Sequence, residues 1–313
     1  MSVNLQKADP FDKVQEKIVY REASMQVGMI GLGRMGMNMA LRLIKGGHTV
    51  IAYNRSPEKT KALAKKGAVA AYSMEELVRS LKTPRCIWIM LPAGKVTDDT
   101  IEQIALLLNK GDILIDGGNS LYKDDIRRSE ALAQLGIGYL DAGVSGGIWG
   151  LENGYCLMIG GAEKLYKKVM PLIRTLAPKT GYLYCGPAGA GHFVKMIHNG
   201  IEYGMMSAIS EGFALLDASP YAESFDYAAI SRLWNQGSVV RSWLMELAKR
   251  AFIADPRLSA ISGRVDDSGE GRWTVQQAID TAVPVPVIAA ALFQRFASRT
   301  ENAFGDRLTA ALR

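Results

Sequence analysis

The chain has 313 residues, of which 48% are hydrophobic and 22% are charged, and its net charge is +6. This length exceeds one typical domain, so we expect two domains with substantial apolar cores. No apolar run approaches the ~20 residues of a membrane-spanning helix. The lysines and arginines are dispersed and form no basic stripe, so we expect neither a membrane nor a nucleic-acid partner. A modest positive charge suits an anionic small molecule.

Residues 1–24 are mixed in charge and contain no apolar segment of the kind found in secretory signals. Acidic residues also argue against a mitochondrial transit peptide. We interpret residues 1–24 as an N-terminal extension and expect the fold to begin at Met25.

The three cysteines, Cys86, Cys156 and Cys185, lie far apart in apolar surroundings. They form neither a Cys-x-x-Cys pair nor a Cys/His metal-ligand spacing. We therefore predict buried, reduced thiols, no metal site and a cytoplasmic location.

Apolar strand patterns and amphipathic helix patterns alternate over residues 25–188. The expected strands are 26–30, 48–54, 85–91, 112–116 and 138–143, and helical patterns cover 74–81, 97–108 and 121–134. This alternation predicts a doubly wound, Rossmann-type parallel sheet, that is, an α/β domain over residues 25–188. The glycine-rich turn after the first of these strands makes NAD or NADP the expected ligand of this domain.

A Gly-x-Gly-x-x-Gly turn follows the first expected strand, with Gly31, Gly33 and Gly36 as its glycines. Between a strand and a helix this turn is a dinucleotide fingerprint. Gly31 permits the tight turn, Gly33 allows close approach of a pyrophosphate, and Gly36 allows close helix–strand packing. Met35 is a further candidate cofactor contact.

The end of the second strand bears on the choice of cofactor. NAD sites usually carry an acid here, whereas this chain has Asn54, Arg55 and Ser56, followed by Lys59. Arg55 can pair with a 2′-phosphate, Ser56 can donate a hydrogen bond, and Lys59 adds positive charge. We predict a preference for NADP, with NAD possible. The alternative is that Arg55 and Lys59 belong to a solvated turn.

Polar or glycine-rich loops follow three other strands, at 92–94, 117–120 and 145–147. Ligands of doubly wound sheets bind beyond the carboxyl ends of the strands, so we expect a cleft there. The candidates in these loops are Leu91 and Ala93 for the cofactor, Asn119 for cofactor and substrate, and Ser145, Gly146 and Gly147 for the substrate.

Residues 189–313 show only helical patterns, which predicts an all-α domain. The expected helices are 190–217, 226–235, 239–253, 274–282 and 285–298. The apolar stretch 283–292 exceeds what a small domain covers alone, so we expect this half to form a homodimer or homotetramer interface. Asp266 and Asp267 lie in a polar loop without further metal ligands at useful spacing.

One face of the expected helix 190–217 carries polar side chains that are candidates for catalysis. His198, Asn199, Glu202 and Tyr203 follow Lys195 at +3, +4, +7 and +8, the spacings that share one face of an α-helix. We expect Met196, Ile197 and Ile201, in contrast, on other sides of the helix, packed in a core. The alternative is a solvated stripe with an intrahelical Lys–Glu pair.

These motifs together resemble the 6-phosphogluconate dehydrogenase family, and specifically its short bacterial-type members. The resemblance covers about residues 25–300 and rests on the segments 31–36, 54–56, 116–120, 144–147, 191–203 and 271–274. The Lys-x-x-His-Asn-x-x-Glu-Tyr pattern separates the chain from the 3-hydroxyacid dehydrogenases, which keep the lysine and an asparagine but not the glutamate and tyrosine.

The resemblance implies oxidative decarboxylation of 6-phosphogluconate to ribulose 5-phosphate, a step of the pentose phosphate pathway. Lys195 matches the general base and Glu202 the general acid, while His198 and Asn199 orient the substrate. Asn119 bridges nicotinamide and substrate, and 145–147 holds the substrate carboxylate. Tyr203 and Arg295 match residues that bind the substrate phosphate.

The chain also departs from the family. It lacks the extra helical domain and C-terminal tail of the long members. A phosphate-binding lysine falls at Ser268 and a neighbouring threonine at Glu270, so we expect Arg272 or another subunit to compensate. Pro92 replaces a lysine of the long members. Short members often bind NAD through an acid at the position of Asn54.

Two other functions stay open. A 3-hydroxyacid dehydrogenase, acting on 3-hydroxyisobutyrate or tartronate semialdehyde, would use Lys195 without requiring Glu202. A non-catalytic NADP-binding protein would bind the cofactor without turnover.

Overall fold

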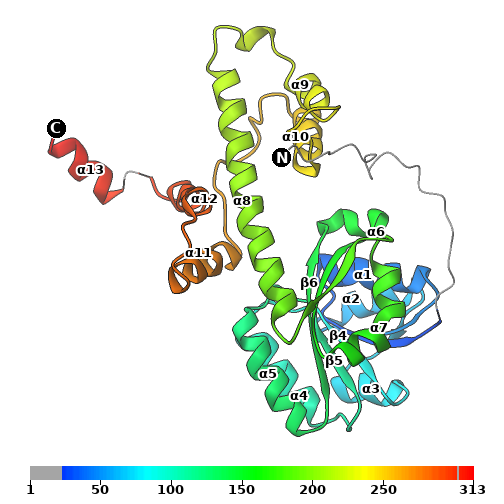
Figure 1. The fold of residues 1–313 in the computed structure, drawn as a ribbon. Coiled ribbons are helices and arrows are strands. Elements are labelled where there is room, and N and C mark those ends of the chain that lie inside the picture. The colour runs from blue at the N-terminus through cyan, green and yellow to red at the C-terminus, as the bar shows by residue number, and fades with distance from the viewer. Residues whose placement is uncertain (1–22, 302) are drawn as a thin grey trace, which may run out of the picture.

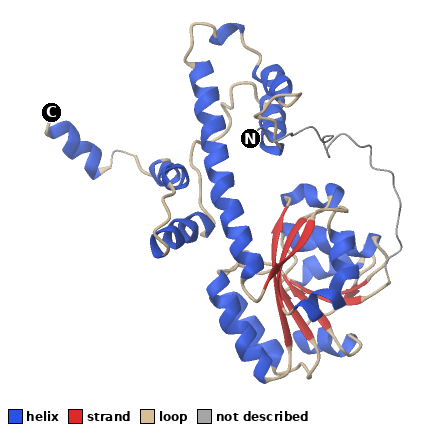
Figure 2. Cartoon of the chain, in the orientation of Figure 1, coloured by secondary structure: helices blue, strands red, loops and turns tan. Residues whose placement is uncertain are grey.

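The structure is a computed structural model and describes residues 23–301 and 303–313 (Figure 1). The expected N-terminal extension lies almost entirely outside the described residues. An α/β half with one sheet is followed by a helical half that extends away from it (Figure 2).

The sheet has eight strands in the order β3-β2-β1-β4-β5-β6-β7-β8. They are β1 (Gln26–Ile30), β2 (Thr49–Tyr53), β3 (Val69–Ala70), β4 (Cys86–Ile89), β5 (Ile113–Asp116), β6 (Gly138–Ser145), β7 (Cys156–Gly161) and β8 (Tyr182–Gly186). The expected doubly wound arrangement is confirmed for β1 to β6, which are parallel.

One strand that the sequence did not predict departs from this arrangement, because β7 runs antiparallel to β6. Only residues 146–155 join these strands, and a parallel crossover needs a dozen or more residues. β8 then pairs parallel with β7. The strands β3, β7 and β8 were not predicted from the sequence.

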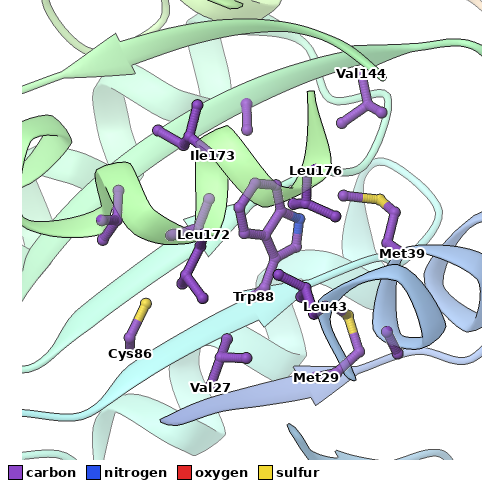
Figure 3. Packing of buried hydrophobic residues seen from close by; sticks show 14 of the residues in the cluster. Val27, Met29, Met39, Leu43, Cys86, Trp88, Val144, Leu172, Ile173 and Leu176 are labelled. Carbon is purple, nitrogen blue, oxygen red and sulfur yellow. The ribbon is translucent and has the colours of Figure 1, made fainter. Parts of the chain in front are cut away.

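Helices cover both faces of the sheet. They are α1 (Arg34–Lys45), α2 (Pro57–Ala64), α3 (Met74–Ser80), α4 (Lys95–Ala105), α5 (Tyr122–Gln134), α6 (Gly150–Asn153) and α7 (Glu163–Leu176), with a 3₁₀ turn, η1 (Gly147–Trp149). Successive residues of β4 alternate between two cores: Trp88 packs with α1 and α7 (Figure 3), and Ile87 and Ile89 pack on the opposite face with α3 and α4. This alternation explains why the central strands are apolar throughout.

The helical half begins with the long helix α8 (Ala190–Asp217), whose lower end lies against the sheet (Figure 1). It continues with η2 (Ala222–Ser224), α9 (Tyr227–Trp234), α10 (Trp243–Ala254), α11 (Glu270–Asp280), α12 (Pro286–Ala297) and α13 (Phe304–Ala311). Two predicted starts were wrong. α10 begins later, at Trp243, because Ser242 accepts a hydrogen bond from the backbone N–H of Met245. α11 begins earlier, at Glu270, directly after Gly269 with φ 100°.

Two contacts fix the start of α8 on the sheet. Asp141 on β6 accepts hydrogen bonds from the backbone N–H groups of Gly189 and His192, at 2.7 and 2.9 Å. Glycine at 143 allows close approach, because a Cβ there would lie 2.4 Å from the Cβ of Lys195. Lys195 is therefore held at the carboxyl-terminal part of β6.

The prediction of three buried thiols was wrong for two of them. Cys86 is buried in the sheet, but Cys156 is exposed and Cys185 is half-buried. Cys156 is the first residue of β7, and Cys185 lies on β8, the last strand of the sheet. Among the described helices, none is both long and apolar enough to span a membrane.

Candidate active site

A cavity of about 1420 Å³ lies between the sheet and the helical half. The loops after β1, β4, β5 and β6 line one side, and α8 and α10 line the other. Most residues predicted for the site line it: Gly33, Met35, Gly36, Leu91, Ala93, Asn119, Ser145, Gly146, Gly147, Lys195, His198, Asn199 and Glu202. The expected cleft at the carboxyl ends of the strands is therefore present.

The glycine-rich turn has the shape that a dinucleotide requires. Gly31 has φ 92°, and a Cβ there would lie 2.4 Å from the carbonyl oxygen of Met90. A Cβ on Gly36 would lie 2.1 Å from the carbonyl oxygen of Gly31, whereas one on Gly33 would meet no atom within 4 Å. Gly33 thus leaves open space at the N-terminus of α1, where backbone N–H groups attract phosphate. These residues fit the pyrophosphate of a dinucleotide.

The side chain of Asn54 belongs to this turn. Its Oδ1 accepts a hydrogen bond from the backbone N–H of Leu32 at 2.8 Å, and its Nδ2 donates to the carbonyl oxygen of Ser56 at 3.1 Å. Arg55, Ser56 and Lys59 are exposed beside it. These residues and Gly31 do not line the cavity itself.

Arg34 is a candidate that the sequence analysis missed. It is the first residue of α1, is exposed, and lines the cavity. An exposed arginine at a helix N-terminus adds positive charge where phosphate is expected. The sequence could have indicated this role, because Arg34 lies between the second and third glycines of the turn.

The predicted face of α8 brings four polar side chains into the cavity. Lys195, which is 5% exposed, donates a short hydrogen bond to Asn199 Oδ1. Burial lowers the pKa of Lys195, and the carboxylates of Glu270 and Glu202 oppose this shift. A buried amine with a lowered pKa is the form of lysine that can act as a base.

His198 connects this face to the loop after β6. Its Nε2 lies 3.5 Å from Ser145 Oγ, and its Nδ1 lies 3.2 Å from Asn199 Oδ1 and 3.7 Å from Glu202 Oε2. The imidazole can therefore orient Asn199 and Glu202 while its other nitrogen faces the loop.

Asp116 stabilises the loop that carries Asn119 through hydrogen bonds. Its Oδ1 accepts from the backbone N–H of Gly118 at 2.9 Å, and its Oδ2 accepts from Ser120 Oγ at 2.6 Å and from Arg128 at 3.0 Å. Asn119 thus stands on a rigid loop at the cavity wall.

Two predicted substrate residues lie outside the cavity. Tyr203 is buried, and its hydroxyl oxygen accepts a hydrogen bond from the backbone N–H of Ser268 at 3.2 Å. The guanidinium of Arg295 lies over the ring of Tyr203, 3.6 Å from its centroid, and donates to the carbonyl oxygen of Asp266. Of this group, only Ser268 reaches the cavity.

Arg272, which we expected to compensate for the missing family lysine, is paired with a carboxylate and does not line the cavity. Its Nε donates to Asp267 at 2.6 Å, and its guanidinium stacks on Phe296. Arg299 also binds Asp267 at 2.8 Å. Asp267 is therefore paired and buried, rather than solvated as its polar loop suggested.

The expectation for Ile197 and Ile201 was wrong, because both line the cavity. The cavity is wide enough to expose a broad sector of α8 rather than one stripe. The opposite wall was also missed: Ser242, Trp243, Leu244 and Leu247 of α10 line it. Their pattern reads as an ordinary amphipathic helix, so the sequence carried no signal for this role.

One cluster in the described part of the chain has metal-ligand composition: Asp116, Asp125 and His192. Arg128 lies within 3.0 Å of Asp116 and 3.7 Å of Asp125, and His192 Nδ1 lies 2.7 Å from Asp125. An arginine already neutralises these carboxylates, so we interpret the cluster as a buried ion-pair network.

The sheet, the glycine turn and the lysine-bearing cavity define the class of the protein: an oxidoreductase with an NAD(P)-binding domain. The model of the NAD-binding domain of 6-phosphogluconate dehydrogenase matches residues 26–186, and that of the C-terminal domain of the same enzyme matches residues 191–310. The chain belongs to the 6-phosphogluconate dehydrogenase family.

Named relatives agree with this assignment. The chain is 46% identical to a provisional 6-phosphogluconate dehydrogenase, YqeC, of Bacillus subtilis, over 92% of this chain and 96% of the relative. It is 41% identical to an NAD(+)-dependent, decarboxylating enzyme of Haloferax volcanii, over 92% and 96%. It is 40% identical to an NADP(+)-dependent, decarboxylating enzyme of Bacillus subtilis, over 87% of this chain but 61% of the relative.

Solved structures show the same fold. Plasmodium falciparum 6-phosphogluconate dehydrogenase aligns with a TM-score of 0.80 and 31% identity over 92% of this chain and 64% of that chain. Mycobacterium tuberculosis 3-hydroxyisobutyrate dehydrogenase aligns with a TM-score of 0.70 at 21% identity, over 88% of this chain and 95% of that chain, which is a likeness of fold.

Proposed function

We propose that this protein oxidises and decarboxylates 6-phosphogluconate to ribulose 5-phosphate, with NADP preferred over NAD. The observation that carries the proposal is the joint presence of Lys195, Asn199 and Glu202 on the cavity face of α8. Two decarboxylating relatives at 40–41% identity support it.

Lys195 is proposed as the general base. Its buried amine would take the proton of the C3 hydroxyl as C3 is oxidised. NADP, held by the glycine turn, would supply the hydride acceptor. The protonated amine then stabilises the enolate oxygen that develops on C3 as the C1–C2 bond breaks and C1 leaves as carbon dioxide. Asn199, already hydrogen-bonded to Lys195, orients the amine toward this oxygen.

Glu202 is proposed as the general acid that protonates C1 of the ribulose 5-phosphate enediol, which is C2 of the substrate. It lies two turns along α8 from Lys195, on the same cavity wall, so the two groups act at different substrate atoms. His198 lies next to Glu202 and Asn199 and orients both side chains. Asn119 and the loop 145–147 are proposed to bind the substrate hydroxyls and carboxylate through side-chain and backbone N–H groups.

The phosphate site is proposed to lie near Tyr203, Ser268 and Arg295. The ring of Tyr203 holds the guanidinium of Arg295 in place by a cation–π contact. Arg295 is half-buried, and Tyr203 contacts both this arginine and the cavity residue Ser268, so a phosphate at the cavity rim could reach the guanidinium.

The preference for NADP rests on charge. Arg55 and Lys59 lie exposed next to the glycine turn, and the acid typical of NAD sites is replaced by Asn54.

A homodimer or homotetramer, formed by the helical half, is also proposed. Apolar side chains on α12 such as Val287 and Phe293 are exposed in the single chain. The three free cysteines, one of them exposed, suit a reducing cytoplasm.

Initial-rate assays with 6-phosphogluconate, NADP or NAD, and trapping of carbon dioxide test the proposal. We expect one carbon dioxide for each reduced cofactor and a higher kcat/KM for NADP. Glu202→Gln should reduce carbon dioxide release by about a hundredfold or more.

A 3-hydroxyacid dehydrogenase is the second candidate, favoured only by the shared fold. Oxidation of 3-hydroxyisobutyrate, or reduction of tartronate semialdehyde, that is unaffected by Glu202→Gln and releases no carbon dioxide would replace the first proposal. Tight NADP binding without turnover of any of these acids would instead indicate a non-catalytic binding protein.

A further inference from the structure

Glu270, the first residue of α11, is a carboxylate buried beside the helix that carries Lys195. It is 2% exposed, and its Oε2 accepts a short hydrogen bond from Ser268, which lines the cavity. Among the described residues, its Oε1 has no hydrogen-bond partner although it is buried. Buried carboxylate oxygens are normally paired, so this one requires an explanation.

The start of α11 is held tightly against α8. Thr274 Oγ1 lies 2.9 Å from the carbonyl oxygen of Met196, the residue after Lys195, and 2.7 Å from the carbonyl oxygen of Glu270. This approach depends on Gly200, because a Cβ there would lie 2.8 Å from the side chain of Thr274. One threonine hydroxyl therefore connects the backbones next to Lys195 and at Glu270.

Few ionisable groups face Lys195. His198 and Glu202 lie on α8 itself, Cys156 lies on β7, and Glu270 lies on α11, while β6 presents Gly143. Burial lowers the pKa of Lys195, and Glu270 opposes this more strongly than Glu202 does, with Cys156 acting in the same direction. The side chain of Glu202 is 40% exposed and is screened by solvent, whereas Glu270 is buried, so the carboxylate of α11 is the less screened counter-charge.

We propose that Glu270 is a positioning residue that acts through Lys195, as the buried counter-charge that decides when the amine is free to take a proton. The inference rests on the proposed function, in which Lys195 is the general base. A fixed carboxylate raises the proton affinity of the amine, so it strengthens the base and stabilises the ammonium needed for decarboxylation. Its consequence is a smaller fraction of neutral amine at low pH.

The test measures the titration of Lys195 directly, without turnover. The full-length wild type and Glu270→Gln are labelled with trace acetic anhydride over a range of pH, and acetylation of Lys195 is quantified by peptide mass spectrometry. We expect the pH midpoint of Lys195 acetylation to fall by about half a pH unit or more in Glu270→Gln. The reason is that the attraction between the Glu270 carboxylate and the Lys195 ammonium, which acts through a low-dielectric interior, is lost. Asp280→Asn, at the exposed far end of α11, is the control and should leave the midpoint unchanged.

An unchanged midpoint in folded Glu270→Gln would overturn the proposal. If that variant fails to fold, Glu270→Asp serves instead: its charge is withdrawn by one methylene, so a lower midpoint is expected and an unchanged one contradicts the role.

Because labelling needs no substrate, the outcome is independent of whether 6-phosphogluconate is turned over. Where turnover is found, the acid limb of the pH profile of kcat/KM should shift to lower pH by the same amount in Glu270→Gln. A merely structural role would lower the rate without moving this limb.

Discussion

Asn54 accepts a hydrogen bond from the backbone N–H of Leu32 at 2.8 Å, which joins the end of β2 to the glycine turn after β1. Its Nδ2 also donates to the carbonyl oxygen of Ser56. Both polar atoms of the Asn54 amide therefore bond to backbone groups. The exposed Arg55 is the neighbouring residue best suited to bind a 2′-phosphate.

Arg55→Ala should therefore raise KM for NADP by about tenfold or more, the loss of a charge-assisted hydrogen bond, with little effect on KM for NAD. Initial rates with both cofactors measure the difference. Arg79→Ala, on an exposed arginine of α3, is the control and should alter neither KM. Equal effects on both cofactors would contradict the assignment.

Asn54→Asp should shift the preference toward NAD. The carboxylate can still accept the N–H of Leu32, but it repels a 2′-phosphate and can bind a ribose 2′-hydroxyl. We expect the ratio of kcat/KM for NADP over NAD to fall by roughly tenfold or more. A ratio equal to that of the wild type would show that residue 54 only supports the turn.

The sequence was sufficient for features that local patterns specify. The glycine turn predicted one end of the cavity because Gly31 and Gly36 have steric reasons to be glycine and Gly33 leaves open space at the start of α1. The polar spacing from Lys195 predicted one wall because α8 is a regular helix. β7 and β8 were missed because their apolar runs are short and contain glycines.

Other parts depend on tertiary contacts that no local pattern encodes. Trp243 and Leu247 face the cavity because α10 folds back over it, although such residues usually mark a core. Glu270 is buried because α11 packs on α8 at Gly200. From the sequence alone, Glu270 is predicted to lie in a polar loop.

Two glycines of α8 should respond in opposite ways to alanine. Gly200→Ala places a methyl 2.8 Å from Thr274, so we expect a loss of about 1–3 kcal/mol in unfolding free energy. Gly212→Ala meets no atom within 4 Å and should stabilise the helix by about 0.5–1 kcal/mol. Urea denaturation of both variants measures the contrast. A stabilised Gly200→Ala would contradict the close packing of α11 on α8.

Stability should depend on pH through His192, which is 1% exposed and lies 2.7 Å from Asp125. Burial alone would lower the pKa of His192, but the carboxylates of Asp125, Asp116 and Asp141 raise it to about 9. This folded-state value exceeds the ~6.5 of an unfolded histidine.

The stabilisation from His192 is therefore full below about pH 6.5 and is lost as pH rises through about 9. Chemical denaturation between pH 6 and 10 should show a decline of up to roughly 3 kcal/mol over this window. His192→Asn, which cannot take up this proton, should be less stable at pH 6 and should lack the decline. An equal slope in wild type and variant would assign the decline to other groups.

A cation–π contact joins the two halves of the protein across the cavity. The guanidinium of Arg250 on α10 lies 4.5 Å from the ring centroid of Trp149, which follows the loop after β6, and 5.1 Å from that of Trp243. Both tryptophans line the cavity. Because these contacts hold α10 over the site, they should favour the closed cavity by about 1–2 kcal/mol.

Arg250→Ala should therefore raise KM for the substrate several-fold with a smaller change in kcat, and should alter the intrinsic fluorescence of the two tryptophans. Steady-state kinetics and fluorescence emission spectra measure these effects. Lys249→Ala removes a neighbouring cation that, like Arg250, pairs with Glu246, and it should leave both properties unchanged. If both variants behaved alike, the effect would come from the charge of α10 rather than from the contact with Trp149.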